Sequence, residues 1–97
     1  MKIIWTKNAK NELYEIKIFW DKKTRSMKYS SGLYLQIKEK LVNISHFPEI
    51  GTRTSEKNIR KLIIDNYVIF YTIVNNEIYI LKIWDNRRNP DDLNIIN

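Results

Sequence analysis

The apolar residues of this chain change their spacing once, close to residues 47–51. Before this point they recur every three or four positions, in two sets that are each typical of one helix face. The first set is Ala9, Leu13, Ile16 and Trp20, and the second is Leu33, Ile37, Leu41 and Ile44. After it, β-branched and aromatic residues dominate, as they do in strands. The sequence therefore predicts helices followed by strands, an order typical of the α+β class.

The first half of the chain is expected to form an antiparallel helical hairpin. A short strand is predicted at residues 3–5, followed by a helix of about 15 to 18 residues that Thr6 or Asn8 caps. Residues 22–32 are basic and then contain Ser and Gly, so they form a turn, a frayed helix end or an early piece of the next helix. The segment 47–51, Phe-Pro-Glu-Ile-Gly, ends the second helix, because Pro and Gly are unfavourable in a helix interior.

The second half is expected to form three antiparallel strands, at residues 59–64, 67–74 and 78–84. Asp65-Asn66 and Asn75-Asn76 separate them, and both residue types tolerate the positive φ that two-residue hairpin turns require. The first strand joins this sheet at an edge. The predicted fold is therefore α+β with the order β-α-α-β-β-β, a helical hairpin packed on a small antiparallel sheet.

Two-residue turns also predict which residues face one another across the strands. Arg60 is expected opposite Tyr71, and Ile69 opposite Lys82. One sheet face would then carry Arg60, Leu62, Ile64, Tyr67, Ile69, Tyr71, Ile73, Ile78, Ile80, Lys82 and Trp84. Both faces are largely apolar, and the greater number of polar groups on this first face favours it as the face left partly open.

The composition describes one small globular domain that spans residues 1–97, with 43% hydrophobic residues. The net charge of +6 favours nucleic acid, an acidic protein or an anionic membrane surface as a partner, and a merely solubilising surface is the alternative. The absence of cysteine excludes disulfides, thiolate metal sites and a Cys nucleophile. Because no apolar run approaches the roughly 18 residues of a membrane span, and no signal peptide is evident, the protein is expected in the cytoplasm.

The familiar catalytic and metal-binding patterns are absent from the sequence. His46, the only histidine, stands at the end of the second predicted helix and is interpreted as a capping or packing residue. The paired acids Asp91-Asp92 and Glu12 with Glu15 are interpreted as solvated charges. With two glycines in all, the chain has no glycine-rich phosphate loop. No metal site and no cofactor are predicted.

The remaining candidates for function are basic. One group surrounds the start of the second predicted strand and consists of Arg53, Lys57, Arg60 and Lys61. Another, Arg87 and Arg88, follows the last strand, where rigidly placed guanidinium groups could hold an anion. A third, of Lys22, Lys23, Arg25 and Lys28, lies near the helical turn. The first two groups are expected at opposite ends of the sheet unless long side chains reach a common groove. The alternative is solvated charge, with Arg88 paired to Asp85 or Asp91.

Several short segments, in a characteristic order, extend over nearly the whole chain. They are the first strand with the Ala9…Leu13…Ile16 helix, Phe47-Pro48-Glu49-Ile50-Gly51, Arg60-Lys61-Leu62, Tyr67-x-Ile69-x-Tyr71, and Ile80-Leu81-x-Ile83-x-Asp85-x-Arg87-Arg88-Asn89-Pro90. Together they resemble the RelE/ParE superfamily of toxins from bacterial type II toxin–antitoxin modules. The resemblance implies a growth inhibitor that a cognate antitoxin neutralises. That antitoxin is expected to be small, partly disordered and often acidic, which suits a basic toxin.

The resemblance implies one of two activities. ParE-like members poison DNA gyrase and are not nucleases, whereas RelE-like members cut mRNA at the ribosome without a metal. In this chain, Ile63 stands where RelE-like enzymes have a catalytic arginine, and no Tyr or His follows Arg88. The resemblance is therefore closer to ParE-like members, and an enzymatic activity is not favoured.

The candidate residues differ between these readings. As a ribonuclease, the protein would use Arg60, Tyr71, Lys82 and Arg88. As a binding protein, it would contact its target or antitoxin through Arg53, Lys57, Arg60, Arg87 and Arg88. A degenerate toxin that survives only as a non-toxic basic interaction domain is the third alternative.

Overall fold

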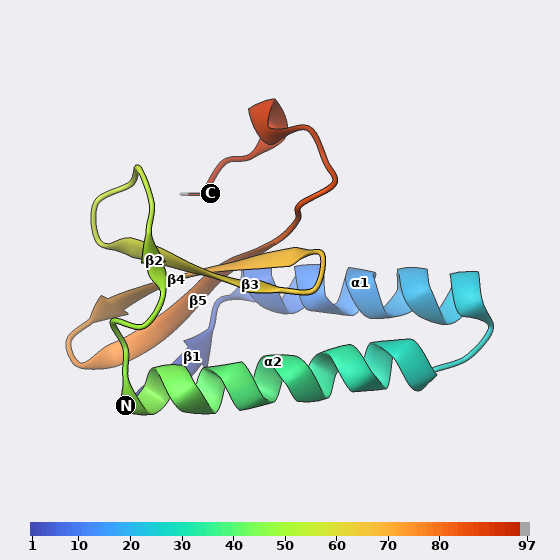
Figure 1. Cartoon of the computed structure of the whole chain (residues 1–97), viewed down its shortest axis with the longest axis horizontal. Helices are drawn as coiled ribbons and strands as arrows, with labels where there is room; N and C mark the ends of the chain where they lie inside the picture. The colour runs from blue at the N-terminus through green and yellow to red at the C-terminus, as the bar shows by residue number, and fades with distance from the viewer. Residues whose placement is uncertain (96–97) are drawn as a thin grey trace.

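In the computed structural model, which describes residues 1–95, two antiparallel helices pack on one face of a five-stranded sheet (Figure 1). In chain order the elements are β1 (Lys2–Trp5), α1 (Lys7–Thr24), α2 (Lys28–His46), β2 (Thr52–Arg53), β3 (Ile59–Ile64), β4 (Tyr67–Val74), β5 (Glu77–Asp85) and the 3-10 helix η1 (Pro90–Asp92). The strand order is β1-β5-β4-β3-β2, with β1 parallel to β5 and the other neighbours antiparallel. The predicted fold class is confirmed, and β2, too short to show a periodic pattern, is added to the predicted order.

The helical hairpin begins where the sequence predicts it. Thr6 is the N-cap of α1, and its hydroxyl accepts a hydrogen bond from the Ala9 N–H at 3.2 Å. Arg25 ends α1 in the left-handed backbone region with φ 55°. Because α2 starts at Lys28, the ambiguous segment 22–32 divides into the end of α1, a short turn and the start of α2.

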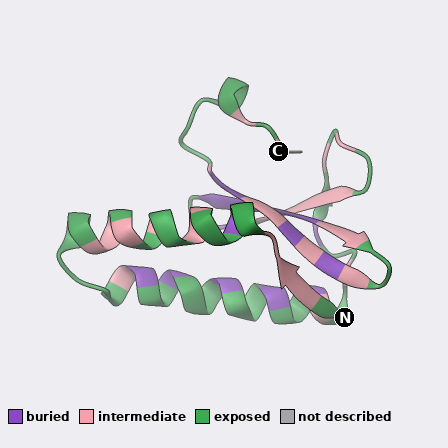
Figure 2. Ribbon diagram, turned by 180° about the vertical axis from the view of Figure 1, so that it is seen from behind, coloured by how far each residue is buried: buried purple, intermediate pink, exposed green. Residues whose placement is uncertain are grey.

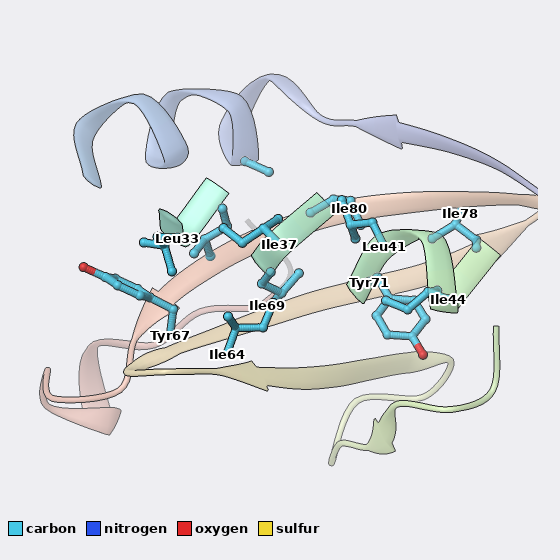
Figure 3. Packing of buried hydrophobic residues seen from close by; sticks show 12 residues of the cluster. Leu33, Ile37, Leu41, Ile44, Ile64, Tyr67, Ile69, Tyr71, Ile78 and Ile80 are labelled. Atoms are coloured by element: carbon cyan, nitrogen blue, oxygen red, sulfur yellow. The ribbon is translucent and has the colours of Figure 1, made fainter. Parts of the chain in front are cut away.

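The core lies between the helices and the sheet face that the sequence favoured as partly open, so that expectation is wrong (Figure 3). The buried sheet residues there are Ile64, Tyr67, Ile69, Tyr71, Ile78, Ile80 and Ile83. The two helices cover them unequally (Figure 2). α2 presents a buried stripe along its length, whereas α1 fully buries only Ala9. α1 therefore keeps much of its surface available to partners.

The register follows the prediction in the first hairpin and departs from it in the second. Arg60 pairs with Tyr71, as expected. In the next hairpin Tyr71 pairs with Ile80 but Phe70 pairs with Lys82, which leaves Leu81 as a β-bulge. Ile69 consequently faces Ile83 and not Lys82. From this point on the alternation is shifted by one residue, so Lys82 and Trp84 leave the core face.

Side chains of α1 complete the hydrogen bonding of the bulge. β1 pairs with β5 only as far as Ile80, so the outer edge of β5 beyond it has no neighbouring strand among residues 1–95. Glu12 supplies the hydrogen-bond acceptor that a neighbouring strand would otherwise provide. Its carboxylate accepts hydrogen bonds from the Ile83 N–H at 3.0 Å and from the Lys82 Nζ at 3.1 Å. Asn8 donates to the Leu81 carbonyl at 3.1 Å. α1 thereby fixes the shifted half of β5.

The segment after β5 covers part of the opposite sheet face. Figure 1 shows it returning on the side of the sheet away from α2. Leu93 and Ile95 pack there against a small cluster of Val68, Phe70 and Trp84. Within residues 1–95, no helix is both long enough and apolar enough to cross a membrane.

Candidate functional site

Arg60 and Tyr71 together hold the turn between α2 and β2. Tyr71 is fully buried, and its hydroxyl accepts the Gly51 N–H at 2.9 Å and donates to the Pro48 carbonyl at 2.8 Å. Arg60 Nη1 donates to the carbonyls of Glu49 at 3.1 Å and Gly51 at 2.8 Å. Burial raises the pKa of Tyr71, so its phenol stays protonated at neutral pH. Both side chains therefore have clear structural roles.

The four residues named for a ribonuclease do not lie together. Arg60 and Tyr71 pair near one end of the sheet. Arg88 follows the last residue of β5, Asp85, which pairs with Tyr67 at the other end. Lys82 lies between these ends on the shifted part of β5, in an ion pair with the carboxylate of Glu12. Lys82 pairs with Phe70, the neighbour of Tyr71, but the bulge places it on the other face of the sheet.

The five residues named for binding divide into two sites. Arg53, Lys57 and Arg60 line one cavity of about 520 Å³ under the loop between β2 and β3. Arg87 and Arg88 lie beyond the far end of β5. The expected separation of the two basic groups is thus what the structure contains.

The two arginines after β5 are held in different ways. Arg87 forms a bidentate pair with Asp85, with Nε to Oδ1 at 2.9 Å and Nη2 to Oδ2 at 2.7 Å. This pair holds the pKa of Asp85 below its usual range. Arg88 has no ion pair among residues 1–95, and its guanidinium carbon lies 4.5 Å from the centre of the Trp84 ring. The alternative that Arg88 pairs with Asp85 or Asp91 is therefore wrong, because Arg87 takes Asp85.

Trp20 connects these arginines to the tip of the helical hairpin. The Arg87 guanidinium carbon lies 5.5 Å from the centre of the Trp20 ring, and Lys23 Nζ lies 5.6 Å from it. The ring is fixed by a 2.7 Å hydrogen bond from its Nε1 to the Tyr67 hydroxyl and by a tilted contact with Tyr29. We call Trp20, Lys23, Trp84, Arg87 and Arg88 the basic corner.

The sequence named Arg87 and Arg88 as binding candidates, but it placed Trp20 on the apolar face of α1 and did not connect Trp20, Lys23 and Trp84 with these arginines. The available signal was the basic group at the hairpin tip, which contains Lys23 together with Lys22, Arg25 and Lys28. That signal does not reveal the link to Arg87, since the link depends on where β5 ends beside α1. Phe19, which Lys23 also contacts at 5.5 Å, is about half exposed, so the surface combines cations with an accessible aromatic ring.

An apolar groove runs along the outside of the helical hairpin. It consists of two adjoining cavities of about 360 and 580 Å³ that share Lys10, Leu13 and Tyr34. Tyr14 and Tyr34 are exposed on it, at 63% and 47%. Lysines stand at its sides, namely Lys10, Lys17 and Lys38. This arrangement suits an amphipathic segment with acidic flanks. The spacing of residues in the sequence does not indicate such a groove directly.

Within the described residues, no three His, Cys, Asp or Glu side chains gather in a way that could hold a metal ion. His46 is the last residue of α2 and is exposed.

Comparison with known proteins places these features in a family context. The model of the family described as the ParE toxin of the type II toxin–antitoxin system, parDE, matches residues 3–90. A solved structure, a chain of the chromosomal ParDE toxin–antitoxin system from P. aeruginosa, is similar with a TM-score of 0.73 and 18% sequence identity. The similarity covers 86% of this chain and 92% of that one, and at this identity it concerns the fold. No curated protein sequence matches.

Proposed function

This chain belongs to the ParE toxin family of type II toxin–antitoxin systems, and from that premise we propose that it arrests bacterial growth by poisoning DNA gyrase in the cytoplasm. The supporting observation is the dispersal of the residues that a ribonuclease would need. Cleavage of a phosphodiester requires proton-transfer groups and a phosphate-stabilising cation around a single phosphate. Here Tyr71 and Arg60 are bonded to the turn after α2, and Lys82 is paired with Glu12.

We propose the basic corner as the contact with gyrase. Arg88 stacks on Trp84 without an ion pair among the described residues, so its donors are free for a partner's carboxylates or backbone. Lys23 and the neighbouring lysines at the hairpin tip extend the same positive surface. The hairpin reaches past the sheet at this end, which makes the surface accessible to a large protein (Figure 1).

A supercoiling assay tests this proposal. The purified chain should inhibit native gyrase at micromolar concentration, and Arg88→Gln combined with Lys23→Gln should raise the inhibitory concentration about tenfold. Lys40→Gln, an exposed lysine of α2 away from the corner, is the matched control and should leave inhibition unchanged. Absence of inhibition by the wild-type chain would contradict the gyrase proposal.

A translation assay on programmed ribosomes runs in parallel with the gyrase assay. Cleavage of mRNA in the A site that is lost in Arg88→Ala would favour the ribonuclease alternative. Intact transcripts during growth arrest would exclude it. Expression in the natural host, in the absence of antitoxin, without any growth defect would support the third alternative, a degenerate non-toxic chain.

We propose the helical groove as the antitoxin site. Its apolar floor and flanking lysines suit an acidic amphipathic segment that folds on binding. With the small protein encoded beside this one as ligand, Tyr34→Ser should weaken binding about tenfold. Leu35→Ser, equally exposed on α2 but outside the groove, should have little effect. Equal effects of the two substitutions would exclude the groove as the site.

A further inference from the structure

Two arginines face one another at the edge of the sheet farthest from β1. Arg53 of β2 and Arg60 of β3 are direct cross-strand partners in the antiparallel register. Like charges at such positions repel one another and destabilise the pair. Within residues 1–95 no ion pair offsets the repulsion, and the only side-chain hydrogen bonds of Arg60 are those of Nη1 to the carbonyls of Glu49 and Gly51.

The two arginines share a cavity with a third cation. The cavity of about 520 Å³ is lined by Arg53 at the end of β2, Lys57 in the loop that follows and Arg60 at the start of β3. The loop that carries Lys57 is fixed by Thr54, whose hydroxyl lies 2.9 Å from the Ile59 carbonyl and 3.1 Å from the Glu56 N–H. The loop therefore holds a preformed shape, and the cations converge on the same space without a ligand.

The carboxylates that line the cavity form no direct pair with these cations. Glu49 and Glu56 line the same cavity, but neither forms an ion pair in the described part of the chain. Arg60 Nε and Nη2 make no hydrogen bond there either, since Nη1 makes both bonds that anchor the side chain. A planar guanidinium with free donors on a fixed stem is suited to the oxygens of a tetrahedral anion.

We propose that this cavity binds a phosphate group carried by a small molecule such as a nucleotide. Two guanidinium groups and an ammonium group match a phosphate monoester, which carries up to two charges and three acceptor oxygens. The cavity volume is in the range of small-molecule sites and leaves room for the group to which the phosphate is attached. A bound phosphate would also remove the repulsion between Arg53 and Arg60. The site lies away from the basic corner and goes beyond the proposed action on gyrase.

Titration of the ¹⁵N-labelled chain with inorganic phosphate and, separately, with AMP tests the site, with chloride holding the ionic strength constant. Both probes should shift the amide resonances of residues 52–60 and the Arg60 Nε–H resonance along saturable curves. Arg53→Gln should weaken binding about tenfold, because it removes a charged hydrogen-bonding partner. Glu56→Gln should tighten binding, and Lys40→Gln should leave it unchanged. Non-saturating shifts, or equal affinity in Arg53→Gln, would overturn the proposal.

A glutamate-rich peptide is the third ligand in this titration. Shifts of residues 52–60 with the peptide but not with phosphate or AMP would overturn the phosphate assignment in favour of an acidic protein partner. Thermal unfolding gives an independent measurement: without ligand at low salt, Arg53→Gln should melt above the wild type, and a given phosphate concentration should stabilise the wild type more than the variant. If Arg53→Gln without ligand melted below the wild type, repulsion between Arg53 and Arg60 would be contradicted. Neither measurement depends on gyrase, so the two proposals can fail separately.

Discussion

Tyr71 places a hydroxyl group in the core with a backbone partner on each side. Replacing it with Phe would leave the Gly51 N–H and the Pro48 carbonyl without their partner. We expect Tyr71→Phe to lower the free energy of unfolding by about 1–3 kcal/mol. Urea unfolding measures this loss, and Tyr14→Phe, on an exposed tyrosine, is the control, expected to stay within about 0.5 kcal/mol of the wild type. Similar values for the two variants would contradict the structural role of Tyr71.

Asp85 contributes stability that depends on pH. Its pKa in the folded protein is lowered, chiefly by the hydrogen bonds from Arg87, relative to the unfolded chain. The contribution is therefore complete above the unfolded pKa of about 3.9 and is lost as the pH falls through the lower folded pKa. We expect Asp85→Asn to make the unfolding free energy less dependent on pH below about pH 4. Denaturant unfolding measured at several pH values below about pH 4 tests this expectation, and Asp91→Asn, at an exposed position, is the control. If the unfolding free energy of Asp85→Asn changed with pH as steeply as that of the wild type, the contribution of Asp85 would be excluded.

At the scale of elements, Glu12 binds α1 to the shifted half of β5. Glu12→Ala would remove the acceptor of the Ile83 N–H and the partner of Lys82, so we expect a loss of about 1–3 kcal/mol in unfolding free energy. Glu12→Gln keeps an acceptor oxygen and should recover part of the loss. Hydrogen exchange of the Ile83 amide should become faster in Glu12→Ala, whereas the exposed Glu15→Ala should not change it. An unchanged exchange rate of the Ile83 amide in Glu12→Ala would show that the hydrogen bond to Glu12 does not protect this amide.

The helices and the first hairpin could be predicted because their signals are local. Asp65 adopts a positive φ of 54°, as a tight turn requires, and the register on both sides of it follows from the turn length. The bulge at Leu81 could not be predicted, because both faces of β5 carry apolar residues and the alternation therefore continues without a visible break. The same applies to the basic corner: the contact between Trp20 and Arg87 exists only once α1 and the end of β5 are packed together.

At the scale of the whole molecule, the segment after β5 protects an apolar patch on the second sheet face. Leu93→Ser combined with Ile95→Ser should uncover Val68, Phe70 and Trp84. We expect the indole N–H resonance of Trp84 to shift and binding of a hydrophobic dye to increase, since exposed apolar patches bind such probes. Ile50→Ser, at an already exposed position, is the control. No change at Trp84 in the double variant would mean that the segment does not shield the patch.

The candidate sites occupy separate parts of the molecule. The groove follows the helical hairpin, the basic corner lies near the hairpin tip and the end of β5, and the phosphate cavity lies under the loop before β3. We expect substitutions in different sites to be close to additive in their effects on binding, because distant sites rarely couple. Antitoxin affinity of Tyr34→Ser, Arg88→Gln and the double variant tests this: the double variant should show the sum of the two single losses, and a deviation beyond about 0.5 kcal/mol would show that the groove and the corner are coupled.

Leu81, as an extra residue in β5, changes which sequence positions of the strand face the core. Before it, Ile78 and Ile80 face the helices, and after it Ile83 does. Deleting Leu81 would join Ile80 directly to Lys82, which already pairs with Phe70, so the ladder would become regular and Ile83 would still face the helices. A relative that lacks the extra residue can therefore keep the same order of polar and apolar residues after it, whereas a substitution that removes the bulge without a deletion would turn Lys82 towards the core.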